Sequence, residues 1–137
     1  MAKMDITNLA LRSDSRTLIW ISHVLEHVED DGKAIAELYR VLTPGGIAFV
    51  QVPLWRMKTF EDSSVKTEED RKRVFYQANH VRLYGIDIVE RFRAAGFSEK
   101  VFRAQDFGPD ALLEKGLSFP STDEVFVFRK APGSGPA

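Results

Sequence analysis

The chain has 137 residues, enough for one domain with a buried core and too few for two. Its 19 Lys and Arg residues balance 20 Asp and Glu residues, and the net charge of −1 argues against nucleic acid or an anionic membrane as partner. Cysteine is absent, which excludes disulfides and thiolate chemistry. No stretch approaches the roughly twenty apolar residues that span a bilayer, and the N-terminus lacks the apolar core of a signal peptide. We therefore expect a cytoplasmic protein.

Residues 16–53 carry the strongest pattern in the chain, and we expect them to form a strand, a helix and a second strand. Residues 17–25 are apolar almost throughout, which is typical of a strand buried on both faces of a parallel sheet. Asp30 and Asp31 suit a helix start, where acidic side chains meet unpaired N–H groups and the positive end of the helix dipole. Apolar residues then recur every three or four positions up to Leu42, which predicts one apolar helix face.

The helix is expected to end at Pro44-Gly45-Gly46, because proline cannot continue a helix and glycine accepts the left-handed backbone of a C-terminal cap. Residues 47–53 are predicted to form the second strand. Two parallel strands joined by a helix make a right-handed crossover, and ligands of such sheets bind beyond the carboxyl ends of the strands. Those ends are residues 22–27 and 51–53, so we expect the binding site there.

The pattern beyond residue 53 is less regular. Residues 54–69 are polar with no period, and Thr67 followed by three acidic residues predicts the start of a short helix over residues 71–77. The remaining elements are expected to be a helix over residues 86–95, strands over residues 97–107 and 123–129, and a disordered tail, rich in Pro, Gly and Ser, over residues 131–137.

Several fixed spacings around the first strand and helix combine into one signature. Its residues are Ser22-His23-Val24-Leu25-Glu26-His27, Asp30-Asp31, Glu37-Leu38-Tyr39-Arg40-Val41-Leu42 and Pro44-Gly45-Gly46. In these residues the chain resembles the class I S-adenosylmethionine-dependent methyltransferases, in particular the small-molecule type 11 methyltransferases. A weaker match continues to about Lys130, through residues 80–85 and 92–97. The resemblance implies a transferase with S-adenosylmethionine (SAM) as its cofactor and a small-molecule methyl acceptor.

For the fold, the resemblance implies an α/β domain over residues 1–130, a partial Rossmann-like methyltransferase fold. We expect a mixed sheet of about four strands in the family order 4-5-7-6, with the last strand antiparallel and helices flanking the sheet. Residues 1–15 would be an irregular N-terminal segment, and residues 54–85 an inserted loop and helix region. The family's glycine-rich turn and ribose-binding carboxylate have no counterpart before Asp5, so the sequence corresponds to the C-terminal part of the family domain.

The resemblance also implies which residues contact the cofactor. Asp5 and Ile6 match an acidic and apolar pair that contacts the adenine in the family. The alternative for Asp5 is a surface position in an irregular terminus. Ser22, His23 and Val24 would lie against the methionine portion of the cofactor, largely through their backbone.

Glu26 and His27 are expected to face the substrate. His27 is the candidate catalytic base, because a histidine with a pKa of about 6.5 can take a proton from a nucleophile; the alternative is a structural role as a cap of the next helix. His80, Arg82 and Tyr84 would share one face of an extended run, where Arg82 could bind an acidic substrate group. The competing interpretation is that His80 and Arg82 tie the inserted loop to the sheet.

Three functions are compatible with these residues. The first is a SAM-dependent methyltransferase that is weak or inactive alone, because the N-terminal cofactor-binding half is absent, and whose site another copy or polypeptide completes. The second is a non-catalytic association module, since residues 17–24 would form a bare apolar edge and pair as a homodimer. The third is a metal-dependent hydrolase through the HxxEH pattern of His23, Glu26 and His27. We discard it and expect no metal, because an extended chain does not point both rings the same way.

Overall fold

The computed structural model describes residues 3–102 and 123–133. Its elements are β1 (Arg16–Ser22), the short 3-10 helix η1 (Leu25–His27), α1 (Asp31–Val41), β2 (Leu42–Arg56), β3 (Phe60–Glu61), α2 (Glu68–Phe75), β4 (Arg82–Gly85), α3 (Ile88–Ala94), β5 (Ser98–Phe102) and β6 (Asp123–Arg129). Residues 103–107 of one predicted strand and residues 134–137 of the predicted tail lie outside the described residues.

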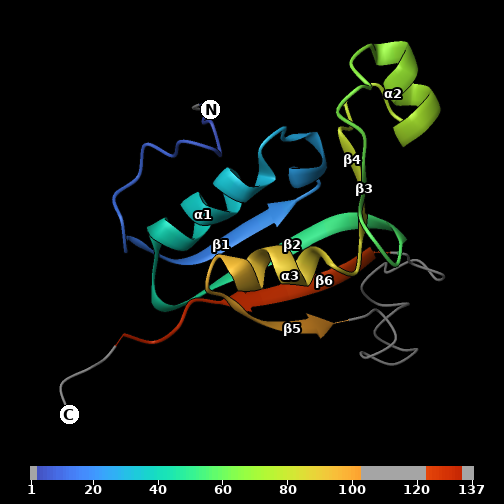
Figure 1. Cartoon of the computed structure of the whole chain (residues 1–137). Coiled ribbons are helices and arrows are strands. Elements are labelled where there is room, and N and C mark those ends of the chain that lie inside the picture. Colours follow the sequence, from blue (N-terminus) through green and yellow to red (C-terminus); the bar gives the residue numbers. More distant parts are fainter. Residues whose placement is uncertain (1–2, 103–122, 134–137) are drawn as a thin grey trace, which may run out of the picture.

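The sheet is mixed and centres on the long strand β2. β1 pairs with β2 in parallel, and β6 lies antiparallel to both β2 and β5 (Figure 1). The order β1-β2-β6-β5 corresponds to the expected 4-5-7-6 with its antiparallel last strand, and the expected α/β fold is confirmed. The order differs from the prediction in one detail. β4 pairs in parallel with the end of β2, and β3 pairs with β4, which extends the sheet to six strands.

Helix α1 begins where the acidic pair predicts it. Asp30 is the N-cap, and its Oδ1 accepts a hydrogen bond from the backbone N–H of Lys33 at 2.9 Å. The helix ends at Val41, and β2 begins at the next residue, five positions earlier than predicted. Pro44, Gly45 and Gly46 lie within β2, at the point where the pairing of β1 with β2 shifts its register. Gly45 has a φ of 77°, in the left-handed region that favours glycine.

One face of the sheet is covered by α1 and α3, which lie side by side (Figure 1). The side chains between these helices and the sheet form the apolar core. Its larger members are Ile21, Leu25, Ile35, Leu38, Val50, Val52, Tyr84, Ile88, Phe92, Phe126 and Phe128. The helical face predicted from the spacing in α1 is therefore the face that is buried.

Strand β1 is not buried on both faces, and this prediction was wrong. Ile21 is buried, but Leu18 is 57% and Trp20 is 62% exposed. The strand also ends at Ser22 rather than at residue 25. The physical reason is that, within the described residues, β1 pairs with β2 alone and forms the edge of the sheet. An apolar run in a sequence thus marks a strand without showing how many of its faces are covered.

The inserted region between β2 and β4 contains β3 and α2. The Oγ1 of Thr67 accepts a hydrogen bond from the N–H of Asp70 at 3.1 Å, so the predicted cap is present, and α2 begins at Glu68 rather than at residue 71.

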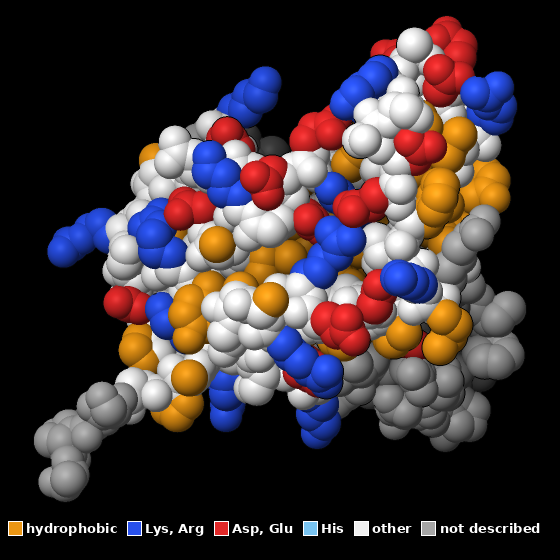
Figure 2. Space-filling model, in the orientation of Figure 1, with side chains coloured by type: hydrophobic (Ala, Val, Ile, Leu, Met, Phe, Trp, Pro, Cys, Tyr) orange, Lys and Arg blue, Asp and Glu red, His pale blue; other side chains and the backbone are white. Residues whose placement is uncertain are grey.

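Figure 2 shows acidic and basic side chains interspersed on the face drawn, without a continuous patch of either sign among the coloured residues. No helix in the described part of the chain has both the length and the apolar character to cross a membrane.

Candidate functional site

The chain leaves the sheet at the carboxyl end of β1, beside the end of the neighbouring β2. The Oγ of Ser22 donates to Oε1 of Gln51 at 3.0 Å, and the N–H of His23 donates to the carbonyl of Gln51 at 2.9 Å. His23 then adopts a φ of 53°, in the left-handed region that a residue with a side chain rarely occupies. This reversal ends β1 and lets η1 fold back, so the residues predicted at the two strand ends do lie together.

Glu26 is the buried centre of this turn. It is 2% exposed, and its Oε1 lies 3.4 Å from Nδ1 of His23 and 3.8 Å from Nε2 of His27. Its other oxygen, Oε2, is buried and has no hydrogen-bond partner among the described residues. The sequence argument took residues 22–27 as extended, which is incorrect beyond residue 22. Because η1 turns the chain, both histidines of the HxxEH pattern reach the same carboxylate oxygen.

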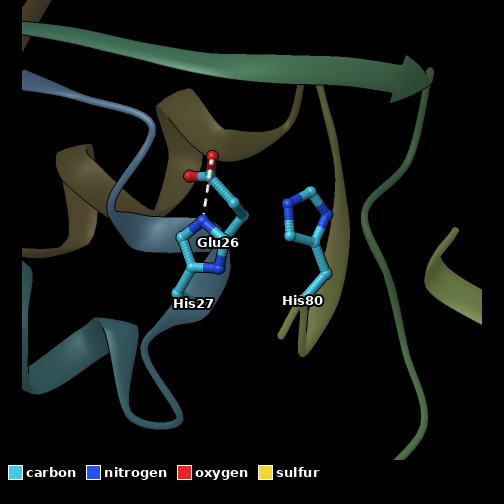
Figure 3. Close-up of side chains that lie close together, drawn as sticks. All are labelled: Glu26, His27 and His80. Carbon is cyan, nitrogen blue, oxygen red and sulfur yellow. Dashed lines mark ion pairs between the residues drawn. The ribbon is translucent and has the colours of Figure 1, made fainter. Parts of the chain in front are cut away.

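His80 joins this turn from the far end of the inserted region. Glu26, His27 and His80 each offer one donor atom, and these atoms lie within 4.8 Å of one another (Figure 3). The rings of His27 and His80 meet edge to face with centroids 4.7 Å apart. His80 is 3% exposed and its Nδ1 has no hydrogen-bond partner within the described chain. We call Glu26, His27 and His80 the acid–histidine cluster.

The two histidines of the cluster differ in their surroundings. Nδ1 of His27 lies 3.0 Å from the carbonyl of Asn79. A carbonyl can only accept, so this nitrogen carries the proton and Nε2 of a neutral His27 carries the lone pair. Burial lowers the pKa of His80, and the nearby rings of His27 and His23 lower it further. His80 is therefore held in the neutral form.

Arg82 lies in the middle of a network of protein acceptors. It is 3% exposed, and its Nη1 donates to the carbonyls of Leu25 at 2.8 Å and Val28 at 2.5 Å. Its Nη2 donates to the carbonyl of Glu29 at 2.9 Å, and its Nε donates to Oε1 of Glu61 at 2.5 Å. These contacts favour the interpretation in which Arg82 ties the inserted region to the sheet over one in which it binds a substrate.

Tyr84 belongs to the same network. Its hydroxyl donates to Oδ2 of Asp31 at 2.6 Å, and Arg91 donates to the same oxygen at 2.7 Å. Burial raises the pKa of the Tyr84 phenol, with smaller contributions from the neighbouring charges. Tyr84 is fully buried, so its neutral hydroxyl donates to Asp31, the first residue of α1, and its side chain presents no surface to a substrate.

Asp5 and Ile6 lie in the irregular segment that runs beside β1 and α1. Asp5 is exposed, and its Oδ1 accepts from the N–H and Oγ1 of Thr7 at 2.9 and 2.7 Å, which lowers the pKa of Asp5. Ile6 lines a groove of about 340 Å³ along β1. The other residues of this β1 groove are Met4, Leu9, Leu11, Arg16, Leu18, Ile19, Trp20, Ile21, Leu38 and Val41.

A pair that sequence reasoning missed holds this segment in place. Glu37 on α1 accepts from the N–H of Leu9 at 2.7 Å and from Arg40 at 2.7 and 2.9 Å. Arg40 in turn donates to the carbonyls of Leu9 and Leu11. The three-residue spacing of Glu37 and Arg40 on one helix face was the available signal. Their partners, 28 or more residues earlier, could not be read from it.

Comparison with known proteins agrees with this architecture. The family described as methyltransferase domain matches residues 1–50. A demethylmenaquinone methyltransferase from Streptomyces avermitilis is 28% identical over 123 residues, which cover 79% of this chain and 53% of that protein. A SAM-dependent methyltransferase from Thermotoga maritima, described as a possible histamine N-methyltransferase, has a TM-score of 0.62 at 20% identity, covering 91% of this chain and 61% of its own. The [4+2]-cyclase SpnF has a TM-score of 0.62 at 17% identity, covering 96% of this chain and 57% of its own.

The chain therefore resembles methyltransferases in its first 50 residues and in its fold. It spans about half the length of the curated relative that it matches. The solved structures share the fold at 20% identity or less, and they include a protein described as a cyclase, so their likeness fixes the architecture and leaves the chemistry to the site.

The network around Arg82 predicts a large loss of stability when the Arg82 guanidinium is removed. Arg82→Met leaves three backbone carbonyls without their donor and removes one of the two arginines that pair with Glu61, and we expect the free energy of unfolding to fall by about 3–5 kcal/mol in urea denaturation. Arg73→Met is the control, because Arg73 is 77% exposed and pairs with Asp70 on the surface. It should cost less than about 1 kcal/mol. Equal losses for the two variants would contradict the role of the network.

The contacts of Glu37 predict a stability change at acid pH. Hydrogen bonds from Arg40 lower the pKa of Glu37 to about 2, from an ordinary value of 4.5. The ionised form is favoured in the folded state, so its stabilisation is present above pH 4.5 and is lost as the pH falls towards 2. Glu37→Gln should be less stable than the wild type at pH 6, and thermal unfolding curves should show this gap closing towards pH 2. A gap that is independent of pH would rule out the assigned shift.

Proposed function

We propose that this chain takes part in SAM-dependent methyl transfer and supplies the side of the site at the carboxyl ends of β1 and β2. The observation that carries the proposal is the reversal at residues 22–27, which projects Glu26 and His27 from the strand ends where ligands of this fold class bind. The family match and the relative described as a demethylmenaquinone methyltransferase support the reaction class.

The residues assigned to the cofactor fit part of SAM. The carboxylate of Asp5 is exposed and accepts hydrogen bonds, as a partner of the adenine amino group must. Ile6 is half-buried beside β1 and offers an apolar surface to a base. The backbone of Ser22, His23 and Val24 would contact the methionine portion. When bound, SAM supplies an activated methyl group, so positioning of the acceptor is the main task of the protein.

The same surroundings predict weak binding by this chain alone. The β1 groove beside Ile6 is apolar, and Arg16 is the one charged residue among its described lining. Two ribose hydroxyls need hydrogen-bond acceptors, and each unmet bond to a buried group costs about 1 kcal/mol or more. We therefore propose that residues beyond those described here, from another copy or another polypeptide, complete the cofactor site.

On the acceptor side, His27 is the proposed base. Its side chain is 32% exposed, and the carbonyl of Asn79 holds its proton on Nδ1. The lone pair on Nε2 can then take a proton from an acceptor as its nucleophilic atom attacks the methyl group. Glu26 and His80 would line the acceptor site next to His27. Arg82 and Tyr84 would support these residues without contacting the acceptor, since their polar atoms already bind other parts of the chain.

The cofactor proposal is tested by titration calorimetry with SAM and one matched pair of variants. Asp5→Asn should weaken binding by roughly 5- to 10-fold, the equivalent of one ordinary hydrogen bond. Asp62→Asn is the control, because Asp62 accepts from the N–H and Oγ of Ser64 just as Asp5 accepts from Thr7. It should leave binding unchanged. Equal affinities for all three proteins, or no binding at millimolar SAM, would refute the assignment.

A second candidate function follows from the exposed edge of β1. Leu18 and Trp20 are more than half exposed on a strand that pairs only with β2 within the described residues. Such an edge offers unpaired N–H and C=O groups together with apolar side chains. We propose a second copy of the chain as its partner, because antiparallel pairing of two β1 strands about a two-fold axis satisfies both edges at once.

Sedimentation at micromolar concentration tests the dimer. The wild type should sediment as a dimer, and Trp20→Lys should sediment as a monomer because it places a charge on the pairing edge. Trp55→Lys is the control, since Trp55 is also half exposed but lies at the C-terminal end of β2 and not on β1. A monomeric wild type, or a Trp20→Lys variant that remains dimeric, would exclude this interface.

A further inference from the structure

We propose that the acid–histidine cluster of Glu26, His27 and His80 binds one divalent transition-metal ion, with zinc as the best match to its ligands. The metal site goes beyond the proposed methyl transfer and does not depend on it, and it assigns the Nε2 lone pair of His27 to the ion instead of to a methyl acceptor. It revises the expectation of no metal, which was based on an extended conformation for residues 22–27. In the structure η1 turns this segment, and Glu26 and His27 lie beside His80 (Figure 3).

The donor atoms are close to the spacing that zinc requires. Zinc binds imidazole nitrogen and carboxylate oxygen at about 2.0–2.2 Å, which places tetrahedral ligand atoms about 3.3 Å apart. Oε1 of Glu26 and Nε2 of His27 are 3.8 Å apart, and all three donors lie within 4.8 Å of one another. Small rotations of the side chains would bring the three atoms onto one ion without moving the backbone.

Two buried atoms of the cluster lack partners. Oε2 of Glu26 and Nδ1 of His80 are each buried without a hydrogen bond in the described structure, on side chains that are 2% and 3% exposed. A buried carboxylate without full pairing is destabilising. A cation bound by the carboxylate of Glu26 and the ring of His80 would offset this cost.

The hydrogen bonding of the two histidines suits a metal. The carbonyl of Asn79 accepts the Nδ1 proton of His27, which leaves the lone pair on Nε2, directed at Glu26. Metal-binding histidines commonly donate their second N–H to a backbone carbonyl in this way. His80 is buried, and its Nδ1 has no hydrogen-bond partner within the described chain.

The composition of the cluster distinguishes it from a hydrolase centre. In the HxxEH pattern two histidines hold the ion and the glutamate acts as a free base. Here Glu26 is itself a ligand, and His80 from the inserted region replaces His23, whose side chain is 46% exposed. Three protein ligands leave a position open for water or for an oxygen of a bound small molecule. His27 reaches the surface and provides the entry path.

Cobalt and zinc titrations of the chelator-treated chain test the site. Co²⁺ bound to this set should give visible ligand-field absorption that saturates at one equivalent and is displaced by Zn²⁺. Zn²⁺ should also raise the thermal unfolding midpoint, since the ion binds the folded state. Glu26→Gln and His80→Gln should each weaken Co²⁺ binding by at least about 100-fold. No absorption at millimolar Co²⁺, or wild-type affinity in both variants, would overturn the proposal.

Two controls separate metal binding from folding. His23→Gln removes a histidine from the same carboxylate oxygen but outside the ligand set, and it should bind Co²⁺ within about threefold of the wild type; a loss as large as that of His80→Gln would overturn the assigned ligands. In excess chelator, Glu26→Gln should unfold at or above the wild-type temperature, because it removes a buried charge. A lower midpoint there would show that Glu26 is satisfied without a metal and would count against the site.

Discussion

The buried guanidinium of Arg82 is the interaction on which the geometry of the site depends. It joins the start of β4 to three carbonyls of residues 25–29, a segment more than 50 residues earlier in the chain. Next to it, the N–H of Val81 donates to the carbonyl of Glu26 at 2.9 Å. These bonds fix where the inserted region returns to the sheet, and they place His80 against Glu26. The acid–histidine cluster is therefore assembled by the backbone contacts of its neighbours.

Paired charges connect the Arg82 network to Asp31, the first residue of α1. Asp31 is 6% exposed and receives hydrogen bonds from Tyr84 and Arg91, while Nε of Arg82 lies 3.8 Å away. Glu61 completes the set by accepting from both arginines. Two cations facing two carboxylates tolerate burial far better than a single charge does. Within the described part of the chain, Glu26 pairs with two histidines and not with an arginine. The contrast singles out its carboxylate as the unusual one.

The sequence predicted what depends on local chemistry. The cap at Asp30, the apolar face of α1 and the strand order followed from spacing and from the signature at residues 22–46, and all are present in the structure. The sequence-based predictions were wrong for features that depend on contacts between distant parts of the chain. The exposure of Leu18 and Trp20 depends on what lies beside β1, and η1 follows a left-handed backbone at His23, a conformation that few non-glycine residues adopt. The approach of His80 to Glu26 spans 54 positions and has no local signal.

The two uses proposed for His27 compete for one lone pair. If Nε2 coordinates a metal ion, it cannot also take a proton from a methyl acceptor, so the ion would have to replace the base by polarising the acceptor directly. If no ion binds, Nε2 is free as a base, but Oε2 of Glu26 and Nδ1 of His80 remain buried without partners. Proteins with this architecture are described both as methyltransferases and as a cyclase, so the side chains at the strand ends determine the chemistry. How the buried carboxylate of Glu26 is neutralised determines whether Nε2 of His27 binds an ion or acts as a base. The chemistry of this site therefore depends on Glu26.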